Sequence, residues 1–307
     1  MGDASRLVWV PFDVAELGEV PEGLRVEQVV PGSDDLPESA ADVELYVPAY
    51  DGGAGQGSLL HRMPRLRVVQ TLTAGVDHIR GEVPEGVTLC NGRGIHNAST
   101  AELAMTLTLA SLRGIPGFVQ DQSAGRWHQG WRRSLADSTV LILGYGDIGR
   151  DLERRLVPFE VDILRVARTP RDGVHGLDDL PELLPRADVV VLIVPGTSET
   201  RGLVDAEFLG RMKDDALLVN VARGPVVVTD DLVAALRAGK VRAALDVTDP
   251  EPLPPEHPLW SAPGVLITPH VGGATPAMWQ RAYRLVREQL ARFAAGQPLA
   301  NVMTGEY

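Results

Sequence analysis

The chain has 307 residues, which is long enough for two domains with buried cores. It is 44% hydrophobic and 23% charged, as expected of a globular protein, and its formal net charge of −12 disfavours nucleic acid as a partner. The single cysteine, Cys90, excludes an internal disulfide framework and a cysteine-cluster metal site, so no metal is expected and the reducing cytoplasm is a compatible location.

The first hundred residues contain short apolar runs between turn residues, the pattern of a small α/β unit. The glycine-rich segment 51–57 is interpreted as a flexible loop. No apolar run in the chain approaches the roughly 20 residues of a membrane span, so no membrane partner is expected. Strands are predicted at 6–10, 26–30, 43–47, 66–71 and 87–91.

A helix is predicted next, at residues 99–113, with Ser99 or Thr100 as its N-cap and with Gly114 and Pro116 at its end. A denser series of apolar runs follows, with helical stretches between most of them. Continuous apolar strands that alternate with helices indicate a parallel sheet covered on both faces. The strands predicted in this series are 139–143, 161–166, 188–194, 216–221, 243–247 and 265–268.

The last predicted element is a long amphipathic helix at residues 276–296. We expect this helix to return and pack on the first unit, because the chain has two segments that resemble crossovers between the units. The predicted domains are therefore residues 1–100 with 274–307, and residues 101–273.

A glycine-rich turn, "LGYGDIGR", lies between a predicted strand and a predicted helix. Gly144 permits a tight turn, Gly146 lets the backbone approach a pyrophosphate, and Gly149 allows close packing of helix and strand. The helix N-terminus then offers N–H groups and a positive dipole to phosphates. In its strand-turn-helix context this motif predicts a dinucleotide site rather than a turn that merely needs glycine. Cofactor contacts are also assigned to Tyr145, Asp147 and Ile148.

The segment "RVARTPRDG" follows the second strand of this unit and lacks the acidic residue that often binds the adenosine ribose. Ala167 occupies that place, and Arg168 and Arg171 lie on either side of Thr169. Arginine presents forked, permanently charged donors that suit a 2′-phosphate, so the segment predicts NADP(H) as the preferred cofactor. The alternative is that the arginines form a solvated turn and that NAD(H) is also accepted.

Three candidate catalytic residues, Arg223, Glu251 and His270, each follow a different predicted strand. Ligands of open α/β sheets bind beyond the carboxyl ends of the strands, so all three belong to the same edge as the glycine turn. Each alone has an ordinary interpretation, as a surface charge, a solvated loop residue or a structural histidine. Together at successive strand ends they indicate a catalytic site.

Reduction of a 2-oxo acid matches these residue types. The nicotinamide cofactor supplies the hydride, and His270 can supply the proton because histidine titrates near neutral pH. Glu251 would orient His270 and favour its protonated form. Arg223 would bind the substrate carboxylate and polarise its carbonyl.

These motifs resemble the D-isomer-specific 2-hydroxyacid dehydrogenases. The resemblance rests on "GYGDIG", "ADVVVLIVPGTSETRGLVD", "MKDDALLVNVARG", "LDVTDPEPLPPEHPLW" and "TPHVGGAT", with "QTLTAGVDHI" and "CNGRGIHNASTAELAM" before them. It implies two Rossmann-like domains with parallel sheets and an active site in the interdomain cleft. Residues 1–100 with 274–307 would bind substrate, and residues 101–273 the dinucleotide.

The resemblance also implies roles for individual residues. Arg223, Glu251 and His270 match the family's catalytic positions, and Ala74 and Gly75 match the loop whose backbone amides hold the substrate carboxylate. A cytoplasmic homodimer built on the nucleotide domains is the usual form of the family. Further cofactor contacts are implied at Thr100, Val194, Pro195, Val221, Ala222 and Asp246.

The missing acid at Ala167 is a feature shared with the NADP-using glyoxylate and hydroxypyruvate reductases of the family. The sequence therefore predicts an NADP(H)-preferring reductase of small 2-oxo acids. A dinucleotide-sensing corepressor, or a biosynthetic dehydrogenase for an unusual acid such as a phosphonate, is the alternative. Arg93 and His96 could contact a polar group of the substrate or belong to a surface loop, and Trp127 and Trp131 are expected to pack rather than catalyse.

Overall fold

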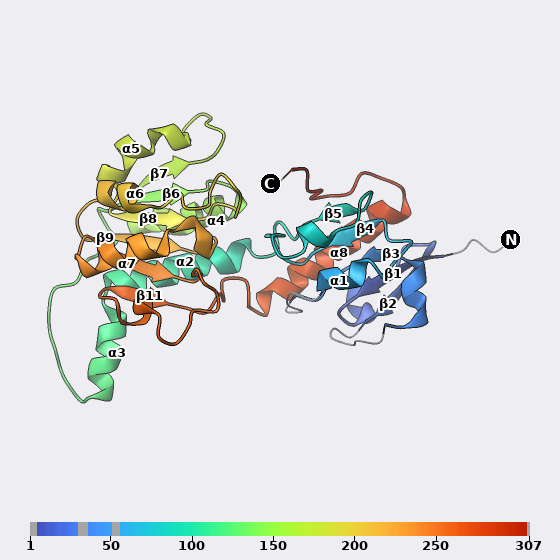
Figure 1. The fold of residues 1–307 in the computed structure, drawn as a ribbon, viewed down its shortest axis with the longest axis horizontal. Coiled ribbons are helices and arrows are strands. Elements are labelled where there is room, and N and C mark those ends of the chain that lie inside the picture. Colours follow the sequence, from blue (N-terminus) through green and yellow to red (C-terminus); the bar gives the residue numbers. More distant parts are fainter. Residues whose placement is uncertain (1–4, 30–35, 51–55, 306–307) are drawn as a thin grey trace. The chain divides into compact units, whose positions relative to one another are not determined.

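The computed structural model describes residues 5–29, 36–50 and 56–305, and the chain divides into two compact units. The first unit is Met1–His96 with Pro276–Tyr307, and the second is Asn97–Thr275. Each unit contains a parallel sheet with helices, which confirms the predicted fold class (Figure 1). The predicted loop 51–57 lies outside the described residues except for its last two positions, which begin helix α1.

The sheet of the first unit has the strand order β2-β1-β3-β4-β5, and all of its pairs are parallel. Because side chains alternate across a strand, Val8 and Val10 face one side of the sheet while Leu7 and Trp9 face the other. Helix α8 (Ala277–Ala294) packs on the Val8 side. The other elements are β1 (Arg6–Val10), β2 (Leu24–Gln28), β3 (Val43–Tyr46), α1 (Gln56–Leu60), β4 (Val68–Gln70) and β5 (Thr88–Cys90).

The sheet of the second unit has the strand order β11-β10-β9-β8-β6-β7, again with parallel pairs only. Helices α2 and α4 cover one face, and α5, α6 and α7 cover the other. The strands are β6 (Thr139–Leu143), β7 (Asp162–Val166), β8 (Val189–Leu192), β9 (Ala216–Asn220), β10 (Val241–Leu245) and β11 (Val265–Ile267). The helices are α2 (Asn97–Leu112), α3 (Ile115–Ser123), α4 (Asp147–Leu156), α5 (Leu180–Leu183), α6 (Ala206–Arg211) and α7 (Thr229–Arg237).

Helix α2 differs from the prediction at both ends. It begins at Asn97, so Ser99 and Thr100 lie inside the helix and the predicted cap is wrong. Gly114 adopts a left-handed conformation and ends the helix as predicted, but Pro116 stands in the first turn of α3 instead of stopping helical structure. Proline fits that position because the first turn of a helix needs no N–H donor from it.

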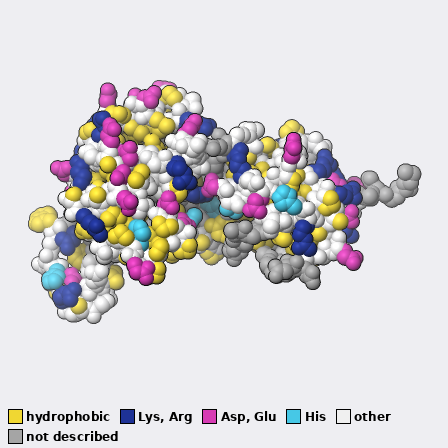
Figure 2. All heavy atoms as spheres, in the orientation of Figure 1, with side chains coloured by type: hydrophobic (Ala, Val, Ile, Leu, Met, Phe, Trp, Pro, Cys, Tyr) yellow, Lys and Arg dark blue, Asp and Glu magenta, His cyan; other side chains and the backbone are white. Residues whose placement is uncertain are grey.

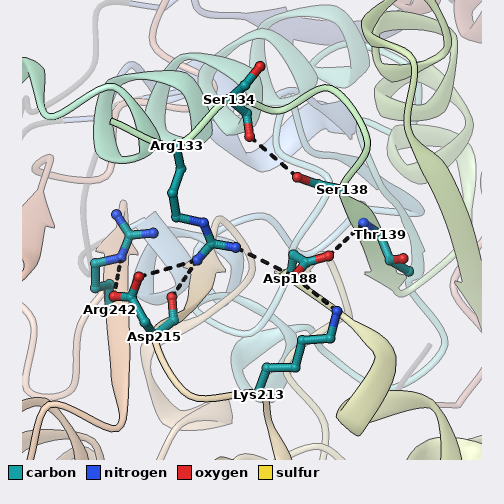
Figure 3. A network of polar contacts seen from close by, with 8 residues as sticks. All are labelled: Arg133, Ser134, Ser138, Thr139, Asp188, Lys213, Asp215 and Arg242. Atoms are coloured by element: carbon teal, nitrogen blue, oxygen red, sulfur yellow. Dashed lines mark hydrogen bonds and ion pairs between the residues drawn. The ribbon is translucent and has the colours of Figure 1, made fainter. Parts of the chain in front are cut away.

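The segment after α3 leads back to the sheet at a network of charged residues (Figure 3). Arg133 donates to the carbonyl of Asp215 at 2.7 Å, and its guanidinium also lies 3.5 Å from the carboxylate of Asp188. Asp188 in turn accepts hydrogen bonds from Lys213 at 3.0 Å and from the amide of Thr139 at 2.9 Å. These contacts join the N-terminal ends of β6, β8 and β9. The N-terminal ends of these strands lie at the edge of the sheet opposite the glycine turn.

None of the helices in residues 5–29, 36–50 and 56–305 is long and apolar enough to cross a membrane. Within the same ranges, no three His, Cys, Asp or Glu side chains are grouped so that they could hold a metal ion.

Candidate active site

The glycine turn connects β6 to α4 and has the backbone geometry of a phosphate-binding turn. Gly144 has a φ of 107°, and a Cβ atom there would lie 2.5 Å from the carbonyl carbon of Ile193. A Cβ atom on Gly149 would lie 2.9 Å from the carbonyl oxygen of Gly144, so helix and strand pack closely there. Gly146, the N-cap of α4, has open space beside it. The turn therefore leaves backbone and helix N-terminus accessible to a pyrophosphate.

The loop after β7 lies against this turn, because the amides of Gly144 and Tyr145 both donate to the carbonyl of Val166 at 2.9 Å. Arg171 is exposed, donates to the carbonyl of Tyr145 at 2.7 Å and holds its guanidinium 5.7 Å from the centre of the Tyr145 ring. Arg168 and Thr169 are exposed on the same loop. The predicted 2′-phosphate residues therefore lie beside the turn, with Arg171 bonded to its backbone.

Arg165, which sequence reasoning did not assign, supports the same turn. It pairs with Glu153 of α4, with its Nε atom 2.9 Å from the carboxylate, and Glu153 also accepts from the hydroxyl of Tyr145. The hydrogen bond from Arg165 is the main reason that the pKa of Glu153 is below its ordinary value. A fixed carboxylate and guanidinium thus hold the Tyr145 ring in place.

Val194 and Pro195 follow β8, and the missing side chain of Gly144 leaves room for the Ile193–Val194 peptide. Thr200 donates to the carbonyl of Pro195 at 2.6 Å and shapes this turn. Val221 and Ala222, two further predicted contacts beyond a strand end, are both buried after β9. All four belong to carboxyl ends of strands in the sheet that carries the glycine turn.

Arg223 and Glu251 approach each other through a backbone contact between two loops. Gly224, just after Arg223, could not carry a side chain, because a Cβ atom there would lie 1.9 Å from the carbonyl oxygen of Thr248. Asn220, which is buried at the end of β9, donates to the carbonyl of Arg223 at 3.1 Å. Sequence reasoning missed Asn220, although a polar residue at the end of an apolar strand is a signal for it.

His270 and Glu251 form the central pair of the site. The Nδ1 atom of His270 lies 2.6 Å from Oε1 of Glu251, and the two side chains are 45% and 41% exposed. The hydrogen bond with His270, followed by weaker attractions that include Arg223, lowers the pKa of Glu251 below its ordinary value. Glu251 is therefore a carboxylate near neutral pH, and it can fix the ring so that Nε2 remains available to a substrate.

Asp246 holds the turn that carries His270. Its buried carboxylate accepts from the hydroxyl of Thr268 at 2.6 Å and from the amides of Val271 and Gly272 at 2.9 and 2.8 Å. The amide of His270 itself, in the left-handed region with a φ of 54°, donates to the carbonyl of Asp246 at 2.7 Å. Thr100 of α2 donates to the carbonyl of Gly272 at 3.4 Å, so it also belongs to this cluster.

The predicted substrate residues Ala74 and Gly75 belong to the first unit and lie in the loop after β4. Ala74 is half-buried and Gly75 is buried. His96 is not the surface residue considered from the sequence, since it is buried and its Nε2 atom lies 2.8 Å from the carbonyl oxygen of Leu72 in this loop. The residues that hold the loop, above all Asn91, were not assigned from the sequence.

Comparison with known proteins agrees with this geometry. The family model of the D-isomer specific 2-hydroxyacid dehydrogenase NAD binding domain matches residues 105–272. The glyoxylate reductase/hydroxypyruvate reductase of Homo sapiens is 35% identical over 249 residues, which cover 76% of each protein.

Solved structures show the same similarity over nearly the whole chain. A D-isomer specific 2-hydroxyacid dehydrogenase from Xanthobacter autotrophicus Py2, in complex with NADPH and MES, has a TM-score of 0.82 at 33% identity and covers 98% of both chains. An NADPH-dependent glyoxylate/hydroxypyruvate reductase from Sinorhizobium meliloti, in complex with NADP and malonate, has a TM-score of 0.79 at 27% identity, with 98% of this chain and 97% of that one covered. The chain therefore belongs to the D-isomer specific 2-hydroxyacid dehydrogenases, nicotinamide-dependent oxidoreductases that act on small 2-oxo and 2-hydroxy acids.

Proposed function

We propose that this protein is an NADPH-preferring reductase that converts small 2-oxo acids of the glyoxylate or hydroxypyruvate type into D-2-hydroxy acids. The observation that carries the proposal is the 2.6 Å contact between His270 and Glu251 at the carboxyl ends of the strands, with Arg223 in the neighbouring loop. Two similar proteins named as glyoxylate and hydroxypyruvate reductases support the choice of substrate class.

His270 is the proposed proton donor to the substrate carbonyl oxygen. The reduced nicotinamide, when bound, supplies the hydride to the carbonyl carbon. Glu251 holds the imidazole through Nδ1 and stabilises its positive charge before the proton is given up. Arg223 attracts the substrate carboxylate and polarises the carbonyl as negative charge develops on its oxygen. In the oxidation direction the same His270 accepts the proton.

The second unit is proposed to bind the dinucleotide, with its pyrophosphate at the glycine turn and its 2′-phosphate at Arg168, Thr169 and Arg171. The support is the open space at Gly146 and the cationic loop beside it, where a ribose-binding acid is absent. The NADPH and NADP complexes of two similar proteins are consistent with this assignment.

The first unit is proposed to bind the substrate through the loop that contains Ala74 and Gly75. Successive backbone N–H groups in such a loop suit a carboxylate. These groups would recognise the acid end that all 2-oxo acids share, so discrimination among acids belongs to other side chains.

A homodimer is the proposed assembly, through the arm formed by α3 and residues 124–134 of the second unit. Trp127 is 88% exposed and Trp131 is fully exposed, so neither side chain packs against the described part of its own chain. Figure 2 shows hydrophobic side chains at the surface of this region, at the lower left. Exposed aromatic side chains of this size are typical of an interface, and a second copy of the chain is the occupant that we propose.

A substrate and cofactor panel tests the proposed function. NADPH or NADH would be mixed with glyoxylate, hydroxypyruvate, pyruvate and larger 2-oxo acids, and oxidation would be followed at the absorbance band of the reduced nicotinamide. We expect the highest kcat/KM with NADPH and a two- or three-carbon acid. Tight NADPH binding with no turnover on any acid would refute the reductase and favour a dinucleotide sensor.

A further inference from the structure

The loop after β4 has its carbonyl oxygens bonded to the body of the first unit. The side chain of Asn91 donates from Nδ2 to the carbonyl of Ala74 at 2.9 Å. The neighbouring carbonyls of Leu72, Thr73 and Gly75 accept hydrogen bonds as well. The contacts are His96 with Leu72 at 2.8 Å, the Gly92 amide with Thr73 at 2.7 Å, the Thr71 hydroxyl with Thr73 at 2.9 Å, and the Thr73 hydroxyl with Gly75 at 2.7 Å.

Fixing these carbonyls also fixes the direction of the N–H groups. A trans peptide is planar, and its C=O and N–H point in opposite directions. The bond from Asn91 to the Ala74 carbonyl therefore aims the N–H of Gly75 away from Asn91. The bonds to the Thr73 carbonyl aim the N–H of Ala74 in the same manner. Successive N–H groups on one side of a loop make a concave site for an anion.

Asn91 is itself held rigidly. Its Oδ1 atom accepts from the amide of Arg93 at 3.1 Å, and its carbonyl accepts from Nε2 of Gln70 at 3.0 Å. Gln70 is fully buried and accepts from Nε2 of Gln289 in helix α8 at 2.7 Å. Gln289, also fully buried, exchanges hydrogen bonds with the backbone of Ala300. A chain of buried amides thus connects α8 to Asn91.

The backbone near Asn91 leaves no room for the loop to move inward. A Cβ atom on Gly92 would lie 2.5 Å from the carbonyl oxygen of Leu72. The two loops are therefore in direct backbone contact, and the side chain of Asn91 bonds the Ala74–Gly75 peptide directly.

We propose that Asn91 is a positioning residue for the substrate carboxylate. It holds the Ala74–Gly75 peptide so that the N–H of Gly75 points at the carboxylate. This inference rests on the proposed function, in which the loop of Ala74 and Gly75 binds the substrate. The Gln289–Gln70 pair holds Asn91 through the hydrogen bond from Gln70 to its carbonyl, and it has no direct role toward the substrate.

The test is Asn91→Ser, assayed with the oxo acid and NADPH in the full chain. Serine keeps an acceptor for the Arg93 amide but is too short to reach the Ala74 carbonyl. We expect KM for the oxo acid to rise about five- to ten-fold, the loss expected of one hydrogen bond, with kcat and the KM for NADPH unchanged. The inhibition constant of malonate, a dicarboxylate with no reducible carbonyl, should rise in parallel.

The matched control is Asn301→Gly. Asn301 donates from Nδ2 to the carbonyls of Asn91 and Arg93 at 3.3 and 3.2 Å, and within the described residues 56–305 no hydrogen bond of this amide reaches loop 72–75. Glycine accepts the φ of 54° at this position without strain. We expect the control to leave KM for the oxo acid unchanged. An unchanged KM in Asn91→Ser, or equal changes in both variants, would overturn the proposal while the proposed function stands.

A second variant and a binding measurement test the same proposal if the first experiment gives no result. If Asn91→Ser does not fold, Asn91→Asp is used, because it keeps the size of the side chain and the Arg93 contact. Its carboxylate would repel the Ala74 carbonyl, so KM for the oxo acid should rise at neutral pH and recover as the carboxyl is protonated. A KM like that of wild type at every pH would overturn the proposal.

If the wild-type protein reduces no 2-oxo acid, the proposed function fails, and the role of Asn91 is tested by binding instead. The affinity of wild type and variant for malonate would be measured by calorimetry. Weaker binding in the variant supports the role of Asn91, and equal binding overturns it.

Discussion

His270 and Glu251 meet at 2.6 Å although each follows a different strand of the second sheet. The contact is made by a turn after β11 that is tied to Asp246 and by a loop after β10 that is pressed against Gly224. The pair therefore depends on three loops at one sheet edge, and its chemistry can be tested through the carboxylate alone.

Glu251→Gln should slow reduction. The lowered pKa of Glu251 means that wild type keeps a carboxylate 2.6 Å from Nδ1 of His270 at neutral pH. The amide has no charge to offset the positive charge of an imidazole that donates a proton, so we expect kcat to fall about ten-fold, equal to ~1.4 kcal/mol. Steady-state kinetics at neutral pH check this, and a kcat equal to that of wild type would rule out a working Glu–His pair.

Arg168→Ala should weaken NADPH binding about ten-fold or more and leave NADH binding nearly unchanged. Charge-assisted hydrogen bonds contribute roughly 1.5–3 kcal/mol each, and only NADPH carries the 2′-phosphate. Arg171→Ala should weaken both cofactors, because Arg171 also donates to the carbonyl of Tyr145 in the glycine turn. Dissociation constants for both cofactors would be measured by fluorescence titration. Equal losses in Arg168→Ala would contradict the 2′-phosphate assignment.

Trp131→Ser, with Trp127→Ser, should shift the protein from dimer to monomer. Both side chains are exposed in the isolated chain, and their burial against a second copy would supply much of the interface energy. Sedimentation equilibrium at several protein concentrations gives the dissociation constant. The control is Trp260→Ser, since Trp260 is 52% exposed, lies outside α3 and residues 124–134, and should leave the assembly unchanged. A monomeric wild type would disprove the proposed dimer.

Asp188→Asn should destabilise the second unit, and the loss should depend on pH. Burial alone raises the pKa of the Asp188 carboxyl, but the Thr139 amide, Lys213 and Arg133 outweigh it, and the net pKa is lowered. A carboxyl group whose pKa is lowered by folding stabilises the folded state at pH values above its pKa in the unfolded chain, ~3.9. This stabilisation is lost as the pH falls through the pKa in the folded chain.

We expect Asp188→Asn to lower the free energy of unfolding by roughly 1–2 kcal/mol at pH 7 and by much less near pH 3. Urea unfolding at the two pH values measures the difference. A loss of the same size at both values would mean that the charge of Asp188 does not stabilise this edge of the sheet.

Much of the fold and part of the site were predictable from local pattern. Apolar runs identify the strands of the second sheet most clearly, because a strand buried on both faces needs continuous apolar side chains. The glycine spacing identifies the turn after β6. The order of Arg223, Glu251 and His270 after successive strands places them at one edge, since carboxyl ends of parallel strands share an edge.

Tertiary contacts alone decided the remainder. Helix α2 begins at Asn97 despite a capping pattern at Ser99, and Trp127 and Trp131 face outward despite their size. Asn91 and Asn220 both stand in motifs that carry the family resemblance, but those motifs assign no role to either residue. The role of each follows from its amide, which reaches a carbonyl of a functional loop in the folded structure. Local pattern records which residues are apolar and where the chain turns. The partner of a side chain far along the sequence is set by how the loops pack, and that requires the folded structure.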